Sequence, residues 1–120
     1  MTTEAKVNVK KANTSICTSI HKWRGKAACL VYSQHTCHSS VEICNSHNMK
    51  LFTIHDDFDA MLILYFTNKQ FHNDSGEFWI HIYDYSHCIA LVSNDGSLSL
   101  QFYDFENDVR KYFFCEFKER

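Results

Sequence analysis

The 120-residue sequence contains no proline, only three glycines and no apolar run long enough for a membrane-spanning helix. Without proline, its turns must rely on Gly, Asn and Asp. With so few glycines it has no phosphate-cradling loop and no Gly-x-Ser-x-Gly motif, which excludes two common kinds of catalytic site. A transmembrane helix would need about 18 consecutive apolar residues, and the N-terminus shows no signal-peptide pattern.

An excess of basic charge is also missing. The formal net charge is −2, whereas a nucleic-acid partner requires a concentrated basic face, so we expect no nucleic acid to bind. Hydrophobic residues make up 45% of the chain and aromatic residues 15%, enough for the core of a single domain of this length. Residues 1–16 are polar and aperiodic, which predicts a stalk or tail before a domain spanning residues 17–120.

Six cysteines are a high and even number for a chain of this length. Cytosolic proteins rarely carry so many unless they bind metal, so an oxidising compartment is expected. Two N-glycosylation motifs fit that compartment, Asn13-Thr14-Ser15 and Asn73-Asp74-Ser75. We therefore expect an extracellular domain with Asn13 and Asn73 as glycan acceptors, and we expect its signal or membrane anchor to lie outside this chain.

Two helices are predicted in the first half of the domain. Residues 38–48 form the first, with Val41 and Cys44 on one face. The second is the clearest element, and either Asp56 or Asp57 can cap its first N–H groups. Its apolar residues recur with helical spacing and form one stripe, which consists of Phe58, Met61, Leu62, Tyr65 and Phe66.

Strands dominate the remaining pattern. They are predicted at residues 29–32, 78–82, 88–93 and 111–117, with an extended link at 51–54. Apolar residues at positions 98, 100 and 102 alternate with polar ones, which is typical of a half-buried strand. Asn94-Asp95-Gly96 predicts a tight hairpin before it, because Asp-Gly tolerates positive φ angles. The order of elements predicts an α+β fold.

This order, with these cysteines, resembles the C-type lectin-like domain over residues 17–117. Cys17 and Cys29 bracket Trp23 as the family's N-terminal hairpin pair does. Three further segments match its core strand, central hairpin and closing strand, namely Phe78-Trp79-Ile80-His81-Ile82, Cys88-Ile89-Ala90-Leu91 with Asp95-Gly96, and Phe113-Phe114-Cys115-Glu116. The resemblance implies a C-type lectin-like fold with two helices packed on antiparallel sheets and stapled by disulfides.

The cysteine pairing follows in part from this resemblance, which implies the bridges Cys17–Cys29 and Cys44–Cys115. Cys37 and Cys88 then remain, and either they pair with each other or one of them links two chains. Cys37 cannot pair with Cys44 if residues 37–44 are helical. Their Cα atoms would then lie roughly 10 Å apart, whereas a disulfide requires less than about 7 Å.

Departures from the family pattern argue against its calcium-dependent sugar site. Only five residues separate Ile82 from Cys88, where sugar-binding members insert a long loop, and the proline of their calcium motif is absent. His81 also replaces the usual glycine of the core strand. Glu106-Asn107-Asp108 contains an Asn-Asp pair, but we predict that it forms a turn rather than a calcium site.

No catalytic or metal constellation emerges from the remaining polar residues. His55-Asp56-Asp57 and His87-Cys88 contain residue types that bind zinc, but the eight histidines lack the His-x3-His spacing of a metal helix. A nucleophile formed by Cys37 with His35 or His38 would need a free thiol, which a disulfide framework removes. We therefore expect neither an enzyme nor a cofactor.

Four aromatic residues near predicted strand ends or loops are candidates for partner contacts: Tyr83, Tyr85, Tyr103 and Phe105. Packing within the sheet is the alternative role for each of them. The compact domain resembles natural-killer-type receptors and poxvirus envelope glycoproteins, and its ending Val109–Cys115 is similar to a poxvirus extracellular-virion glycoprotein.

These features predict a calcium-independent, protein-binding module at a cell or virion surface, active in immune recognition or evasion. The resemblance implies the ectodomain of a type II membrane protein that forms a homodimer through an edge formed by its first strand or first helix. Two alternatives remain: a carbohydrate-binding lectin with a non-standard site, and a small secreted enzyme or metal protein.

Overall fold

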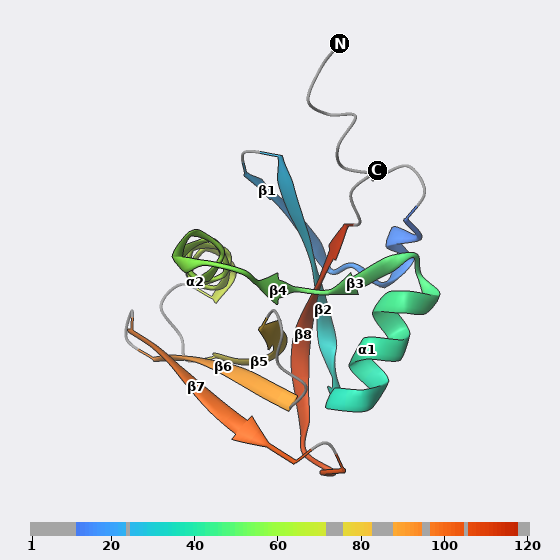
Figure 1. The fold of residues 1–120 in the computed structure, drawn as a ribbon. Helices are drawn as coiled ribbons and strands as arrows, with labels where there is room; N and C mark the ends of the chain where they lie inside the picture. The colour runs from blue at the N-terminus through green and yellow to red at the C-terminus, as the bar shows by residue number, and fades with distance from the viewer. Residues whose placement is uncertain are drawn as a thin grey trace.

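The structure is a computed structural model that describes residues 12–23, 25–71, 76–82, 88–94, 97–104 and 106–117. A short 3-10 helix, η3 (Thr14–Ile16), precedes two helices and eight strands (Figure 1). In chain order these are β1 (Ser19–Trp23), β2 (Lys26–Thr36), α1 (Cys37–Ser46), β3 (Met49–Leu51), β4 (Thr53–Ile54), α2 (Asp57–Phe71), β5 (Gly76–Ile82), β6 (Cys88–Asn94), β7 (Ser97–Tyr103) and β8 (Arg110–Phe117). The protein is thus an α+β fold, as the sequence predicts.

The strands form one mixed sheet, which corrects the expectation of antiparallel sheets. Its order is β1-β2-β8-β5-β6-β7, with β3 added beside β8 and β4 beside β5. Most neighbours are antiparallel, but β5 runs parallel to both β8 and β4. The mixture arises because β8, the last strand in the sequence, lies between β2 and β5. It is antiparallel to β2 on one side and parallel to β5 on the other.

Each face of the sheet packs against one helix. On one face Trp79, Phe113 and Cys115 pack with Cys44 of α1. On the other face Phe78 and Phe114 pack with Leu62 and Ile63 of α2. Successive side chains of a strand point to opposite faces, so the neighbouring residues Phe113 and Phe114 of β8 enter different halves of the core. In Figure 1, α1 and α2 accordingly lie on either side of β2 and β8.

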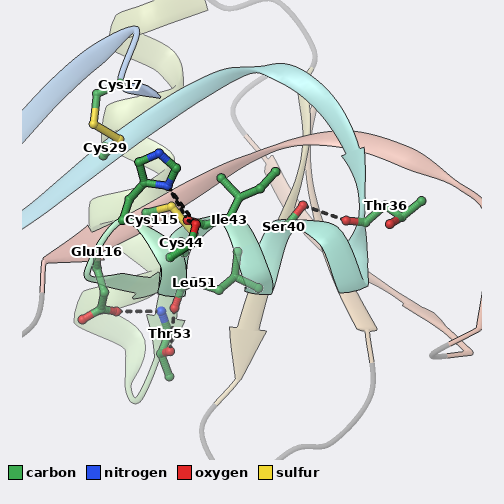
Figure 2. Close-up of a disulfide and its surroundings, with 12 residues drawn as sticks. Cys17, Cys29, Thr36, Ser40, Ile43, Cys44, Leu51, Thr53, Cys115 and Glu116 are labelled. Carbon is green, nitrogen blue, oxygen red and sulfur yellow. Dashed lines mark hydrogen bonds between the residues drawn. A yellow bond between two sulfur atoms is a disulfide. The ribbon is translucent and has the colours of Figure 1, made fainter. Parts of the chain in front are cut away.

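Side-chain caps define where α1 begins. Thr36 is its N-cap, and its hydroxyl accepts a hydrogen bond of 3.2 Å from the backbone N–H of Ser39. The buried Ser40 hydroxyl donates to the Thr36 carbonyl at 2.8 Å (Figure 2). These bonds satisfy polar groups at the junction of β2 and α1, and they fix the helix directly after the strand.

Ala12 and Ile16, which the sequence assigns to a tail, pack against the core cluster on the α1 face. The backbone N–H of Asn13 donates to the carbonyl of His47, just beyond α1, at 2.9 Å. Residues 12–16 therefore lie against the domain beside the end of α1.

The helix α2 begins where the sequence predicts. Asp56 Oδ1 accepts a hydrogen bond from the backbone N–H of Asp59 at 3.0 Å, which makes Asp56 the capping side chain. The helix is rotated about its axis so that its apolar stripe is only partly buried. It buries Asp59, Leu62 and Ile63 against the sheet, while three members of the stripe face solvent: Phe58, Met61 and Tyr65.

Candidate interaction surface

Three disulfides hold the framework together. Cys17 pairs with Cys29, Cys37 with Cys88, and Cys44 with Cys115. No cysteine is free, so Cys37 and Cys88 pair within one chain and form no link between chains. Cys44–Cys115 joins α1 to the central strand β8 (Figure 2). Disulfides of this number are typical of secreted or extracellular proteins.

A cluster of charged residues ties the start of α2 to the sheet; we call Lys26, Asp59, Glu116 and Lys50 the Lys26 cluster. The ammonium of Lys26 lies 2.8 Å from Asp59 Oδ1 and 3.8 Å from Glu116 Oε1. Lys50 lies 3.8 Å from Glu116 Oε2. Glu116 also accepts a 2.7 Å hydrogen bond from the backbone N–H of Thr53, which Figure 2 shows. The cluster therefore joins β2, β3, β4, α2 and β8.

The two buried carboxyl groups of this cluster have opposite pKa shifts. Burial alone would raise the pKa of Asp59, but the hydrogen bond from Lys26 and the backbone hydrogen bond from His55 outweigh it, so that pKa is lowered. Burial raises the pKa of Glu116, and the Thr53 hydrogen bond with the charges of Lys26 and Lys50 offsets only part of the effect. Lys26 thus lies closer to Asp59 than to Glu116 and stabilises the charged form of Asp59 more strongly.

Tyr103, one of the predicted contact residues, lies in an aromatic cluster on the α1 face. Its ring meets Trp79 edge-on at 5.3 Å between centroids, and the Lys111 ammonium lies 5.2 Å from the Tyr103 ring. Lys111 is buried and paired with Glu77. Burial alone would lower the pKa of Lys111, but the interactions with Glu77 and Tyr103 outweigh burial, so that pKa is raised. Tyr103 is half-buried, and its ring packs against Trp79.

The other predicted contact residues cannot be placed. Tyr83, Tyr85 and Phe105 lie outside the described residues, as does the glycosylation candidate Asn73. Asn13 is exposed, and its side-chain oxygen accepts a hydrogen bond from the backbone N–H of Ser15 at 3.1 Å. It is therefore accessible on the surface of the domain.

The largest exposed apolar side chains on a helix belong to α2. Phe58, Met61 and Tyr65 stand at i, i+3 and i+7, so they share one side of the helix. All three are exposed, and Met61 is 68% exposed. Aromatic residues and Met are enriched in the cores of protein interfaces, which makes this α2 stripe a candidate contact surface.

A second aromatic feature lies on the face of the sheet that α2 covers. Tyr32 of β2 and Tyr112 of β8 stack with ring centroids 4.3 Å apart and an interplanar angle of 3°. Tyr112 packs against the core cluster beneath α2, while Tyr32 remains 49% exposed. A side-chain hydrogen bond between Tyr112 and Tyr32 raises the pKa of Tyr112. Tyr32 sits in a bulge of β2, because register with β8 is interrupted between Val31 and His35.

The strand β7 adds exposed apolar residues at the edge of the sheet. Leu100 and Phe102 lie opposite Leu91 and Ile89 of β6, which belong to the core cluster on the α2 face. Leu100 and Phe102 therefore point to that same face, yet they are 40% and 54% exposed. The sequence predicts a half-buried strand here, but its apolar side is more open than this pattern suggests.

The sequence predicts the apolar stripe of α2 but not the exposure of Phe58, Met61 and Tyr65, and it does not single out Tyr32 or the open side of β7. Helical periodicity identifies a stripe but does not show which part of it is buried. One signal was available: Asp59 lies among the apolar positions of α2, and Lys26 and His55 could have been considered as its partners.

Within the described residues, no group of three or more His, Cys, Asp or Glu side chains could hold a metal ion. A shallow hollow of about 230 Å³ beside α1 is lined by His35, Ser39, Glu42, Ile43 and Ser46. Asn107, proposed as a turn residue, uses its amide for the turn itself. It donates to the Asp104 carbonyl and accepts from the Val109 N–H.

Comparison with protein-family models and with curated proteins finds no match to this chain. Among the described residues, no helix is long and apolar enough to cross a membrane.

Proposed function

We propose that this chain is a calcium-independent, C-type lectin-like module that binds a protein partner at a cell or virion surface. Support for the fold assignment comes from the two helices, one on each face of the sheet, and from the three disulfide pairs. The disulfides also favour an extracellular location. In this proposal the chain is a type II membrane ectodomain that serves immune recognition or evasion, for example in a viral envelope.

One observation carries the binding function: the exposed α2 stripe of Phe58, Met61 and Tyr65. Large apolar side chains that share one side of a surface helix are costly to leave in water, and grouped aromatic residues supply the hot spots of protein interfaces. The Tyr32–Tyr112 stack lies on the same face of the sheet as α2, and Tyr32 adds an exposed aromatic ring to that face.

Binding of fluorescent tetramers of the chain to a panel of cell lines tests this proposal. We expect binding that trypsin treatment of the cells abolishes and that a calcium chelator leaves unchanged. Met61→Glu should weaken it about tenfold or more. Val109→Glu is the matched control, since it places the same charge at another exposed apolar residue. Chelator-sensitive binding that survives trypsin would instead support the carbohydrate-binding alternative, and equal loss in both variants would remove α2 from the contact.

A further inference from the structure

The strand β7 (Ser97–Tyr103) forms one end of the sheet. It pairs with β6 through seven consecutive residue pairs without any shift of register. Among the described residues, no strand lies on its outer side. Figure 1 shows β7 along the outside of the sheet. At such an edge, alternate residues direct their N–H and C=O groups away from the sheet, where another strand can bind them.

This edge lacks the features that usually prevent two strand edges from associating. Natural edges are protected by charged side chains, proline, bulges or short length. The sequence of β7, Ser-Leu-Ser-Leu-Gln-Phe-Tyr, carries no charge and no proline. Its seven residues extend over about 24 Å at roughly 3.4 Å per residue. With Leu100 and Phe102 exposed beside the edge, β7 also presents apolar side chains there.

The order of residues in β7 is self-complementary. If a second copy of β7 runs antiparallel with the two-fold axis at Leu100, the residues from 98 to 102 each meet one of the same polarity. The resulting pairs are Leu100 with Leu100, 98 with 102, and 99 with 101. Leu100 and Phe102 lie on one face of the sheet, and Ser99 and Gln101 lie on the other. A slip of one residue would place Leu100 and Phe102 opposite polar residues.

We propose that two copies of this chain associate edge to edge through β7, with the two-fold axis at Leu100. The two sheets then join into one continuous sheet, and Leu100 and Phe102 of each copy become buried against the other. A two-fold contact uses the same patch on both partners, so the patch must match itself. The order of polar and apolar residues from 98 to 102 meets this condition, which favours a second copy over an unrelated strand as the occupant.

Sedimentation equilibrium of the purified chain tests this inference independently of any other partner. We expect a monomer–dimer equilibrium in which Leu100→Lys weakens association about 100-fold, because it sets two like charges opposite each other. Ile20→Lys is the matched control: Ile20 lies on β1 at the other edge, is equally exposed at 40%, and should leave the equilibrium unchanged. Mixing Leu100→Lys with Leu100→Glu should restore association.

A second variant keeps the inference falsifiable if Leu100→Lys fails to fold. Because all six cysteines are paired, Leu100→Cys introduces a single thiol. At the two-fold axis the two thiols would face each other, so mild oxidation or a short bismaleimide should give a covalent dimer, while Ile20→Cys should not. A wild-type chain that stays monomeric at 100-micromolar concentrations, or a dimer that cross-links only through Ile20→Cys, would overturn the proposal.

Discussion

The two edges of this sheet differ in how far their side chains hinder pairing with another strand. β1 has five residues, including His21 and Lys22, and a two-fold pairing centred on His21 would oppose Ile20 to Lys22. β7 has seven uncharged residues, and a two-fold pairing centred on Leu100 matches polarity from residue 98 to residue 102. The two edges therefore differ in how well each complements a copy of itself. The difference comes from side-chain charge and order, not from the fold.

Each edge is also anchored differently to the rest of the domain. Near β1, the disulfide Cys17–Cys29 closes a short loop, and the Lys26 cluster begins at the first residue of β2. Near β7, the disulfide Cys37–Cys88 ties β6, the only strand neighbour described for β7, to the start of α1. The two edges can therefore be weakened separately.

The largest expected effect is loss of the disulfide on the β7 side. Cys37–Cys88 closes a loop of 51 residues and Cys17–Cys29 a loop of 12. In the chain-entropy description these loops correspond to about 4 and about 3 kcal/mol of stabilisation, respectively. Urea unfolding should therefore show a larger loss for the Cys37→Ala/Cys88→Ala variant than for Cys17→Ala/Cys29→Ala. A larger loss for the Cys17→Ala/Cys29→Ala variant would contradict this ranking of the two disulfides by their contribution to stability.

A slightly smaller loss is expected from Lys26→Met. The substitution leaves Asp59 and Glu116 buried without their central cation, which costs about 3 kcal/mol. Hydrogen exchange should show weaker protection in β1 and β2 but unchanged protection in β6 and β7. Glu42→Gln is the control, because Glu42 and its partner His38 are both exposed and should contribute less than about 1 kcal/mol. Uniform loss of protection would contradict separate anchoring of the edges.

The smallest effect concerns pH. Burial raises the pKa of Glu116 above its ordinary value of 4.5, so the folded state binds that proton more tightly than the unfolded state. Protonation of Glu116 therefore adds stability as pH falls through the range just above 4.5. Asp59 has a lowered pKa and behaves oppositely, losing its stabilising contribution as pH falls below 3.8.

Glu116→Gln removes only the first of these contributions, since a glutamine oxygen can still accept from the Thr53 N–H. The free energy of unfolding of the variant, relative to wild type, should therefore decrease as the pH is lowered from 7 to 4. Urea titrations at a series of pH values measure this difference. A variant whose relative stability stays constant or rises on acidification would show that burial of Glu116 does not govern its titration.

Local signals in the sequence were sufficient for most elements. Asp56 marks the start of α2, and strands near 78–82, 88–93 and 111–117 match β5, β6 and β8 within one or two residues. β2 is far longer than the predicted strand at 29–32, because polar residues continue it to Thr36 on the edge beyond β1. Alternation and capping act over a few residues, so these boundaries are encoded locally.

The contact surfaces depend on interactions between distant segments. Asp59 is buried because Lys26, 33 residues away, pairs with it, and this turns α2 so that Met61 faces solvent. The parallel pairing of β5 and β8 likewise depends on where the last strand enters the sheet. Neither fact follows from periodicity within one segment, so the exposed stripe and the mixed sheet could not be predicted.

The central position of β8 also affects how the chain folds during synthesis. β8 is the last described strand to be translated, yet β2 and β5 both require it as their neighbour. Its Cys115 is also the last cysteine to appear, so Cys44 has no native partner until then. During that interval the thiol of Cys44 can exchange with the earlier bridges. In an oxidising compartment, the native pairing could therefore be completed only after translation has reached β8.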